Sequence, residues 1–134
     1  MNPSTDGNGP TEDKTVADRN EHLVREYFQA VWNDGDMEPF DTDVVSDDYV
    51  MHHQSNAEYS RAAPRPAWAD WHGGFPDLSN DIEDLIVTHD RVVIRYRFSA
   101  THEGKVMGIP AADRDVETAG IVIIRVEDGR IAEE

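Results

Sequence analysis

The chain has 134 residues, which is enough for one domain with its own hydrophobic core and too few for two. It carries 28 acidic residues against 12 basic ones, a formal net charge of −16. A surface of this charge repels nucleic acids and anionic membranes, so we expect neither as a partner. The absence of cysteine excludes disulfides, thiol nucleophiles and cysteine-ligated metals.

The acidic residues are spread along the whole chain, and its only lysines are Lys14 and Lys105. This pattern favours a halophilic protein, in which concentrated cations screen the acidic surface. An ordinary acidic mesophilic protein is the alternative. Because no apolar stretch is long enough to cross a membrane and the first residues lack a signal-peptide pattern, we expect a cytoplasmic protein.

The N-terminal third predicts a tail followed by a long helix. Residues 1–13 are rich in Pro, Gly, Asn, Asp and Thr, which predicts a disordered acidic tail before a single domain over residues 14–134. From Thr15 onward, apolar residues recur with helical spacing and predict an amphipathic helix. "NDGD" ends it, with Gly35 suited to the left-handed residue after the last turn.

Two shorter helices and a strand are expected next. Residues 37–45 predict a short second helix, with Pro39 tolerated in its first turn, and "DDYVMHH" reads as a short strand. Pro64 and Pro66 are placed to open a third helix, which "GGFPD" ends.

The remainder of the chain has the pattern of β-structure. Three strands are predicted, over about residues 81–88, 90–102 and 115–127, with "THDR" and "EDGR" as tight turns. Helices followed by antiparallel strands predict an α+β domain with its helices packed on one face of a curved sheet. The open end of such a sheet is a common site for a small-molecule pocket.

The strand over 92–102 divides cleanly into two faces. Its inner face ends in large, partly polar side chains: Tyr96, Phe98 and His102. These side chains either wall a cavity or pack as core. Arg95 and Arg97 project outward, where we expect ion pairs with acids on adjacent strands. The strand over 115–127 is apolar on both faces, which indicates that a second copy of the protein packs on the outer one.

No motif in the chain indicates a bound metal or cofactor. His52 and His53 are adjacent, so on a strand they point to opposite faces, which is poor geometry for one metal. Serine-nucleophile, phosphate-loop and dinucleotide motifs are absent. We therefore expect no metal and no cofactor.

The link between the last two predicted strands, "THEGKVMGIPAADRDVETAG", is longer and more apolar than a hairpin needs. With this link, the chain resembles the SnoaL-like polyketide cyclases (ester cyclases), a branch of the NTF2-like superfamily. The resemblance spans about residues 20–133. It is carried by "LVREYFQAVWNDGDMEPFD", "SDDYVMHH", "GGFPDL" and the long segment "DRVVIRYRFSATHEGKVMGIPAADRDVETAGIVIIRVEDGRIAEE".

The resemblance implies a cone of α+β architecture, with three N-terminal helices packed on a strongly curved antiparallel sheet that encloses an apolar pocket. It also implies homodimers formed through the sheet. Characterised cyclases of this family close a ring by intramolecular aldol condensation on an aromatic polyketide ester, without metal or cofactor. One carboxylic acid serves them as acid and base, a role that suits a desolvated carboxyl group.

Matched residue by residue, the family pattern is only partly present. His52 matches the histidine after "Y-V-x", whereas Val122 stands where the cyclases have a histidine. Their catalytic aspartate lies a little beyond "DGRIxE". Glu134 falls about two residues short of that position, on the same strand face but roughly 7 Å away, and we expect it to be a poor substitute. His52 and His102 are the candidate catalytic residues.

The predicted ligand is a bulky apolar carbonyl-type small molecule bound in the cone; if the protein is catalytic, we expect cofactor-free acid/base chemistry on it. The alternatives are a non-catalytic binding module and a dimerisation module whose cavity is filled. The predicted pocket residues are Tyr27, Trp68, Trp71, Phe75, Tyr96, Phe98, Met107, Ile109 and Val122. Met107 and Ile109 would fold back over the mouth of the cavity as a lid.

Overall fold

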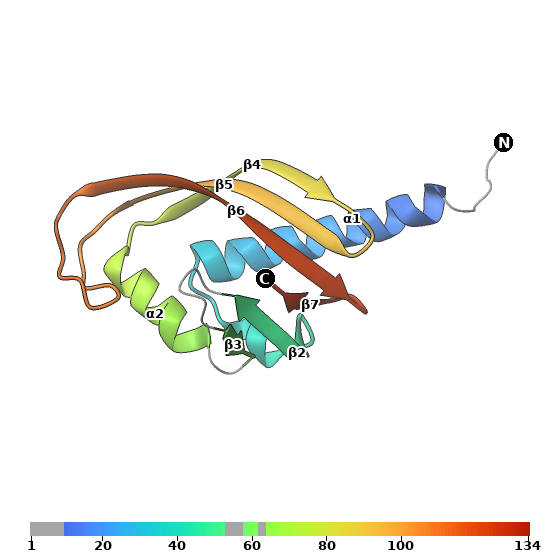
Figure 1. Cartoon of the computed structure of the whole chain (residues 1–134), viewed down its shortest axis with the longest axis horizontal. Helices are drawn as coiled ribbons and strands as arrows, with labels where there is room; N and C mark the ends of the chain where they lie inside the picture. The colour runs from blue at the N-terminus through green and yellow to red at the C-terminus, as the bar shows by residue number, and fades with distance from the viewer. Residues whose placement is uncertain (1–9, 53–57, 62–63) are drawn as a thin grey trace.

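A computed structural model of the chain describes residues 10–52, 58–61 and 64–134. Its elements, in chain order, are helix α1 (Pro10–Tyr27), the π-helical turn η1 (Phe28–Asn33), the 3₁₀ turn η2 (Glu38–Asp41), β2 (Val45–His52), β3 (Glu58–Ser60), helix α2 (Pro64–Gly74), β4 (Ser79–Val87), β5 (Arg91–Thr101), β6 (Asp115–Glu127) and β7 (Arg130–Glu133). Both helices lie on the concave side of the arch formed by β4, β5 and β6 (Figure 1). The predicted α+β class is confirmed. None of the described helices is long and apolar enough to span a membrane.

Helix α1 begins at Pro10, before the position from which the apolar stripe predicts it, and residues 1–9 lie outside the described residues. The stripe itself is buried against the sheet, as predicted. Four of its members are 0–1% exposed: Val24, Tyr27, Phe28 and Val31. Gly35 takes the left-handed conformation, with φ of 69°, that its place after the helix requires.

The prediction of three helices is wrong, because the segment 37–45 forms only the short 3₁₀ turn η2. Pro39 has no backbone N–H to donate, and Val44 and Val45 are β-branched residues that favour extended backbone. Strand β2 therefore begins at Val45, where the predicted helix was to end. The third predicted helix is confirmed as α2, which starts at Pro64.

The sheet has six strands in the order β3-β2-β7-β6-β5-β4. Strands β5 and β6 pair antiparallel along their whole length, from Arg91 opposite Arg125 to Thr101 opposite Asp115. Strand β7 runs antiparallel to β6 and parallel to β2. This pairing carries the last residues of the described chain under the arch, between β2 and the end of α1 (Figure 1).

The two faces of β5 differ in environment as the alternation predicts. Val92 and Ile94 are fully buried on the inner face, and Phe98 is 2% exposed. On the outer face, the predicted cross-strand ion pairs are present: Arg95 lies 3.4 Å and Arg97 3.5 Å from carboxylate oxygens of Glu83. Arg97 also pairs with Glu117, at 3.5 Å.

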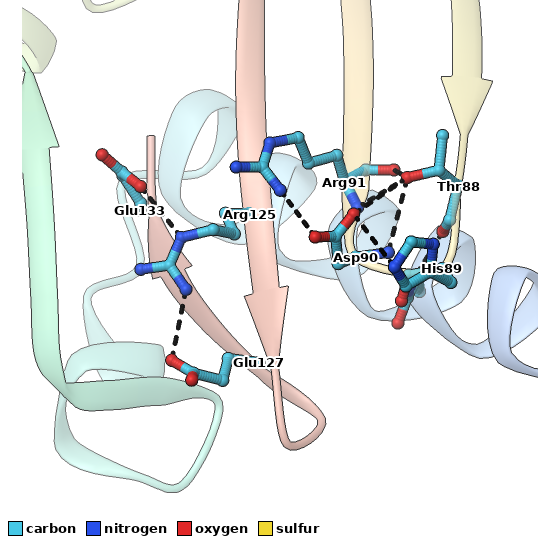
Figure 2. Close-up of polar contacts among 8 residues, drawn as sticks. Thr88, His89, Asp90, Arg91, Arg125, Glu127 and Glu133 are labelled. Atoms are coloured by element: carbon cyan, nitrogen blue, oxygen red, sulfur yellow. Dashed lines mark hydrogen bonds and ion pairs between the residues drawn. The ribbon is translucent and has the colours of Figure 1, made fainter.

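The turn between β4 and β5 is tied to helix α1. Figure 2 shows Thr88, His89, Asp90 and Arg91 at this turn, where the Arg91 guanidinium donates to the Asp90 carboxylate at 2.7 Å. Asn20, which is 5% exposed, donates from its side-chain amide to the carbonyl oxygens of Thr88 and His89, at 3.1 and 2.9 Å. The buried amide of α1 thus satisfies two turn carbonyls that no strand partner reaches.

The link after β5 closes in a tight two-residue turn. Val106 and Ile109 exchange backbone hydrogen bonds of 3.1 and 2.8 Å, and Met107 and Gly108 between them have φ of 49° and 78°. Two positive φ angles in succession are the geometry of a type I′ turn. Val106, only 4% exposed, anchors the arm in the core beside Phe75.

Candidate active site

Glu134 is the buried acidic residue of the described chain: its side chain lies inside the cone formed by the curved sheet and the helices and is 8% exposed. The hydroxyl groups of Tyr27 and Tyr49 both donate to Oε2 of this carboxyl, the second at 2.6 Å. The indole N–H of Trp32 donates to Oε1 at 3.2 Å. Donors from helix α1, the turn η1 and strand β2 therefore converge on a single carboxyl group.

Burial raises the pKa of the Glu134 carboxyl, although the hydrogen bonds from Tyr27, Tyr49 and Trp32 act in the opposite direction. The pKa of both tyrosines is raised as well, first by burial and then by the nearby charge of Glu134. The phenols therefore remain neutral donors, while the carboxyl retains its proton to a higher pH than an exposed glutamate. A carboxyl group with a raised pKa is suited to both accepting and delivering a proton.

Aromatic rings enclose this carboxyl on the side of the helices. The Trp32 ring stacks on Phe28, with centroids 4.9 Å apart, and meets Tyr96 at 5.1 Å and Trp68 at 5.2 Å. Tyr96 is half-buried, and burial followed by the charge of Glu134 raises its pKa. Five of the predicted pocket residues belong to this main core cluster or pack against it: Tyr27, Trp68, Trp71, Tyr96 and Val122.

A second aromatic cluster lies between α2 and β5. Trp71, Phe75 and Phe98 are in mutual ring contact, with centroid distances of 4.8 to 5.4 Å. His102, 8% exposed, packs on Phe75 at 5.4 Å, and its Nε2 atom has no hydrogen-bond partner. The structure thus places four of the predicted site residues together in a second cluster, which adjoins the main core through Trp71 and Tyr96.

His52 lies outside the cone. Its ring nitrogens face two glutamates on neighbouring strands, with Nε2 2.6 Å from Glu133 and Nδ1 3.1 Å from Glu58. The hydrogen bond with Glu133 is the main cause of the raised pKa of this histidine. The adjacent His53 is not among the described residues. The catalytic assignment of His52 stays a prediction without support from the geometry.

Met107 and Ile109 lie at the tip of the hairpin arm and are 61% and 55% exposed. The backbone N–H of Met107 donates to the Asp70 carboxylate of α2 at 2.7 Å, which docks the turn on the outside of that helix. The two side chains are not folded over a cavity in this structure. Their contribution to a pocket stays a prediction.

Two hollows lie on the flank between α1 and β4. One of about 340 Å³ and one of about 360 Å³ share Arg25 and Ile82 in their linings, and most of the remaining lining is polar. Neither includes any of the predicted pocket residues. Within the cone, the aromatic side chains are in contact with one another, so a ligand there requires the rings to separate.

Sequence reasoning missed the carboxyl cluster. Tyr49 lies within the predicted strand "DDYVMHH" and Trp32 on the predicted helical stripe, but neither pattern indicates a polar partner. The expectation that Glu134 is a poor substitute for a catalytic carboxyl was based on its spacing to a family position. The structure adds that Glu134 is buried and meets three donors, which the spacing does not indicate; its catalytic role stays a prediction.

A model of the family described as "SnoaL-like polyketide cyclase" matches residues 22–134. The chain belongs to this SnoaL-like family. No curated protein shows a significant match. The predicted resemblance of the chain to this family is therefore confirmed over residues 22–134.

Solved structures of similar proteins support the same family fold. TsrD from Streptomyces laurentii is 30% identical, with a TM-score of 0.72 over 86% of this chain and 84% of that one. AclR from Streptomyces galilaeus, for which a hydroxylase function has been suggested, is 28% identical, with a TM-score of 0.73 over 88% and 76%. A protein from Jannaschia sp. CCS1, suggested to be a SnoaL-like polyketide cyclase, is 21% identical, with a TM-score of 0.80 over 88% and 83%. The NTF2-like curved sheet of the SnoaL-like family is thus confirmed.

Proposed function

We propose that this SnoaL-like protein binds a bulky apolar carbonyl compound inside the cone and moves a proton on it without a cofactor. The observation that carries the proposal is the buried Glu134 carboxyl, held by Tyr27, Tyr49 and Trp32. A carboxyl with a raised pKa beside neutral phenols is suited to remove a proton next to a carbonyl group.

The proposed step is an enolisation. Ionised Glu134 takes a proton from the carbon next to the carbonyl, and the C–H bonding electrons move into an enolate. The enolate oxygen carries the new negative charge and accepts a hydrogen bond from a phenol of the cluster, Tyr27 or Tyr49. Return of the proton from Glu134 to the same carbon reverses the step. Alternatively, the enolate carbon attacks a second carbonyl group of the same molecule, the C=O π bond breaks as the C–C bond forms, and the resulting alkoxide takes the proton from Glu134.

Entry of a ligand requires the ring contacts in the cone to open. Trp32 and Tyr96 are the half-buried rings next to Glu134, so they form the part of the wall that gives access to the carboxyl. A flat apolar ligand would replace ring-to-ring contacts with contacts of the same kind, at little loss of buried apolar area.

A non-catalytic binding module is the second candidate. The observation that favours it lies in the second aromatic cluster, where buried His102 packs on Phe75 and its Nε2 atom has no hydrogen-bond partner among the described residues. A buried unpaired ring nitrogen is uncommon, and a polar group on a ligand would satisfy it. This arrangement can hold a ligand but cannot by itself relay a proton from Glu134.

Two probes separate these candidates. Binding is read by quenching of the three tryptophans with 1,8-dihydroxyanthraquinone, since all three belong to or border the two aromatic clusters. Proton transfer is read by the exchange of the α-protons of 2-tetralone in D₂O, followed by ¹H NMR. We expect Glu134→Gln to lower the protein-catalysed exchange by at least about a hundredfold while quenching persists.

Glu133→Gln is the matched control, because it removes the neighbouring carboxylate that points out of the cone. Exchange should be unchanged in this variant. Quenching without any catalysed exchange in the wild-type protein favours the binding module. A wild-type protein that neither binds the quinone nor exchanges the tetralone protons contradicts both candidates.

We also propose that two copies associate through the outer face of the sheet. On this face three exposed isoleucines and a half-buried valine form an apolar strip on adjacent strands: Ile86, Val93, Ile121 and Ile123. The isoleucines are 54–66% exposed. Positively and negatively charged side chains lie beside this strip: Arg95 and Arg97 pair there with Glu83 and Glu117. A two-fold axis can pair such a surface with itself, which makes a second copy the occupant of matching chemistry.

A further inference from the structure

Tyr27 and Trp32 hydrogen-bond to the same carboxyl group although they are five positions apart in the sequence. In a regular α-helix each residue turns about 100°, so two residues five apart point about 140° away from each other. One carboxyl group cannot easily meet both. In this structure the chain is not a regular α-helix between the two residues: η1, from Phe28 to Asn33, is a π-helix.

In a π-helix the hydrogen bonds join residues five apart, so such residues lie on nearly the same side. The N–H of Asp34 accordingly donates to the carbonyl oxygen of Gln29 at 2.9 Å. The wider turn brings the Trp32 indole around to Oε1 of Glu134, while the Tyr27 phenol meets Oε2. π-Helical turns are rare and need support from their surroundings, since isolated chains prefer the α-helix.

The support comes from strand β4 and helix α2. Asn80, 6% exposed, donates from its side-chain amide to the carbonyl oxygen of Trp32 at 3.0 Å. Its backbone N–H donates to Oδ1 of Asn33 at 2.6 Å, and its carbonyl oxygen accepts from the Asn33 amide at 3.1 Å. Nε2 of His72 lies 3.0 Å from the carbonyl oxygen of Val31. Two carbonyl groups that the π-helical turn leaves free are thus held by side chains.

We propose that Asn80 is a positioning residue of the active site, which with Asn33 locks the π-helical turn and so aims Trp32 at Glu134. Asn80 touches neither the carboxyl nor the predicted ligand site, and it acts through the backbone of Trp32. Its catalytic meaning rests on the proposed function, whereas its effect on the carboxyl can be measured without any substrate.

The test is the titration of the Glu134 carboxyl carbon by ¹³C NMR in glutamate-labelled protein, assigned with Glu134→Gln. Among the described residues, the ionisable side chains that interact with Glu134 are Tyr27, Tyr49 and Tyr96, and because their pKa values are raised they remain neutral over the titration. Because the Trp32 N–H stabilises the ionised carboxylate, Trp32→Phe should raise the pKa of Glu134. Asn80→Ala should raise it in the same direction.

The double variant decides whether Asn80 acts through Trp32. We expect Asn80→Ala to cause no further shift in the Trp32→Phe background, since the contact it supports is already gone. Full additivity of the two shifts, or an unchanged titration in a folded Asn80→Ala protein, overturns the proposal. If Asn80→Ala does not fold, Asn33→Ala removes the side chain that hydrogen-bonds to the backbone of Asn80. The same two results, full additivity with Trp32→Phe or an unchanged titration, then overturn the proposal.

Asn20→Ala is the matched control. Asn20 is also a buried asparagine that holds backbone carbonyl groups, but it lies at the β4–β5 turn, away from η1. The Asn20→Ala variant should be less stable and should leave the Glu134 titration unchanged. A shift in the pKa of Glu134 equal to that caused by Asn80→Ala overturns the proposal. In the tetralone assay Asn80→Ala should slow exchange about tenfold or more. Absence of exchange in the wild-type protein, with the titration shifts present, refutes the proposed function and leaves the positioning role standing.

Discussion

Glu133 and Glu134 are neighbours in the chain, yet one carboxyl group lies outside the cone and the other inside it. Glu133 accepts a hydrogen bond from Arg125 at 2.9 Å (Figure 2). It also lies 2.6 Å from His52, and the hydrogen bond from Arg125 is the main cause of its lowered pKa. Glu134 meets Tyr27 and Tyr49 instead, and burial raises its pKa. Extended backbone turns successive side chains to opposite faces, so a single peptide step separates the two environments.

This pair predicts opposite pH dependences of stability. The folded-state pKa of Glu134 is above its unfolded value, so its stabilising contribution is complete below the unfolded pKa and is lost as pH rises through the raised one. Glu134→Gln should therefore flatten the fall in the urea midpoint above about pH 4.5. The folded-state pKa of Glu133 is lowered, so Glu133→Gln should remove stability that is present above the unfolded pKa. Urea titrations from about pH 4 to about pH 8 measure both; parallel curves for the two variants contradict this assignment.

Tyr96 and Gly120 face each other across β5 and β6, and the tyrosine ring crosses directly over the glycine. A β-carbon at position 120 would lie 2.6 Å from the Tyr96 hydroxyl oxygen and 2.8 Å from its ring. Gly120→Ala should displace the ring beside Trp32 and destabilise the fold by about 1–3 kcal/mol. Ala119→Ser, at the exposed neighbouring position, should be nearly neutral in the same thermal unfolding experiment. An unperturbed Gly120→Ala protein with unchanged aromatic NMR shifts would show that the sheet has room there.

The exposed strip on the outer face predicts the oligomeric state. Ile123→Glu should convert the proposed dimer to a monomer, because each two-fold interface would bury two new carboxylates in apolar surroundings. Ile109→Glu is the control, since this isoleucine is similarly exposed but lies on the hairpin arm. Light scattering coupled to size exclusion gives the mass directly. A monomeric wild-type protein at micromolar concentration contradicts the proposal.

The hairpin turn carries a methionine where a left-handed residue is needed. Met107→Asn would give the Asn-Gly pair that type I′ turns prefer, and should raise stability by about 0.5 kcal/mol. Met107→Val should lower it, because a β-branched side chain tolerates positive φ poorly. If Met107 also serves as a lid, Met107→Asn should weaken quinone quenching although the protein is more stable. Unchanged quinone affinity would limit the role of this tip to the turn itself.

The formal charge of −16 predicts that the thermal midpoint rises with salt. Raising KCl from about 0.1 M to about 2 M shortens the screening length several-fold and should relieve the self-repulsion of the acidic surface. Sucrose at matched water activity, which does not screen charge, should raise the midpoint less. Full stability in dilute buffer would favour an ordinary acidic protein.

The sequence alone was sufficient for the architecture, because hydrophobic periodicity is a local property. The period-two alternation of β5 and its outward arginines, the left-handed Gly35 and the helix opened at Pro64 were all predictable from neighbouring residues. The prediction of a second helix over residues 37–45 was wrong, because the β-branched Val44 and Val45 at its end favour extended backbone and lead into β2. Family membership followed from the hairpin arm and the strands around it.

Only the tertiary structure decided the site. Tyr27, Tyr49 and Glu134 are far apart in the sequence, and nothing local shows that their polar atoms share a buried point. The same is true of His52, whose strand position is predictable but whose ring faces outward to two glutamates. A π-helical turn, held by an asparagine on β4, sets which side of the helix Trp32 occupies. Periodicity in the sequence determines which residues are buried. The packing of distant segments determines which buried polar groups contact one another, and the proposed chemistry depends on those contacts.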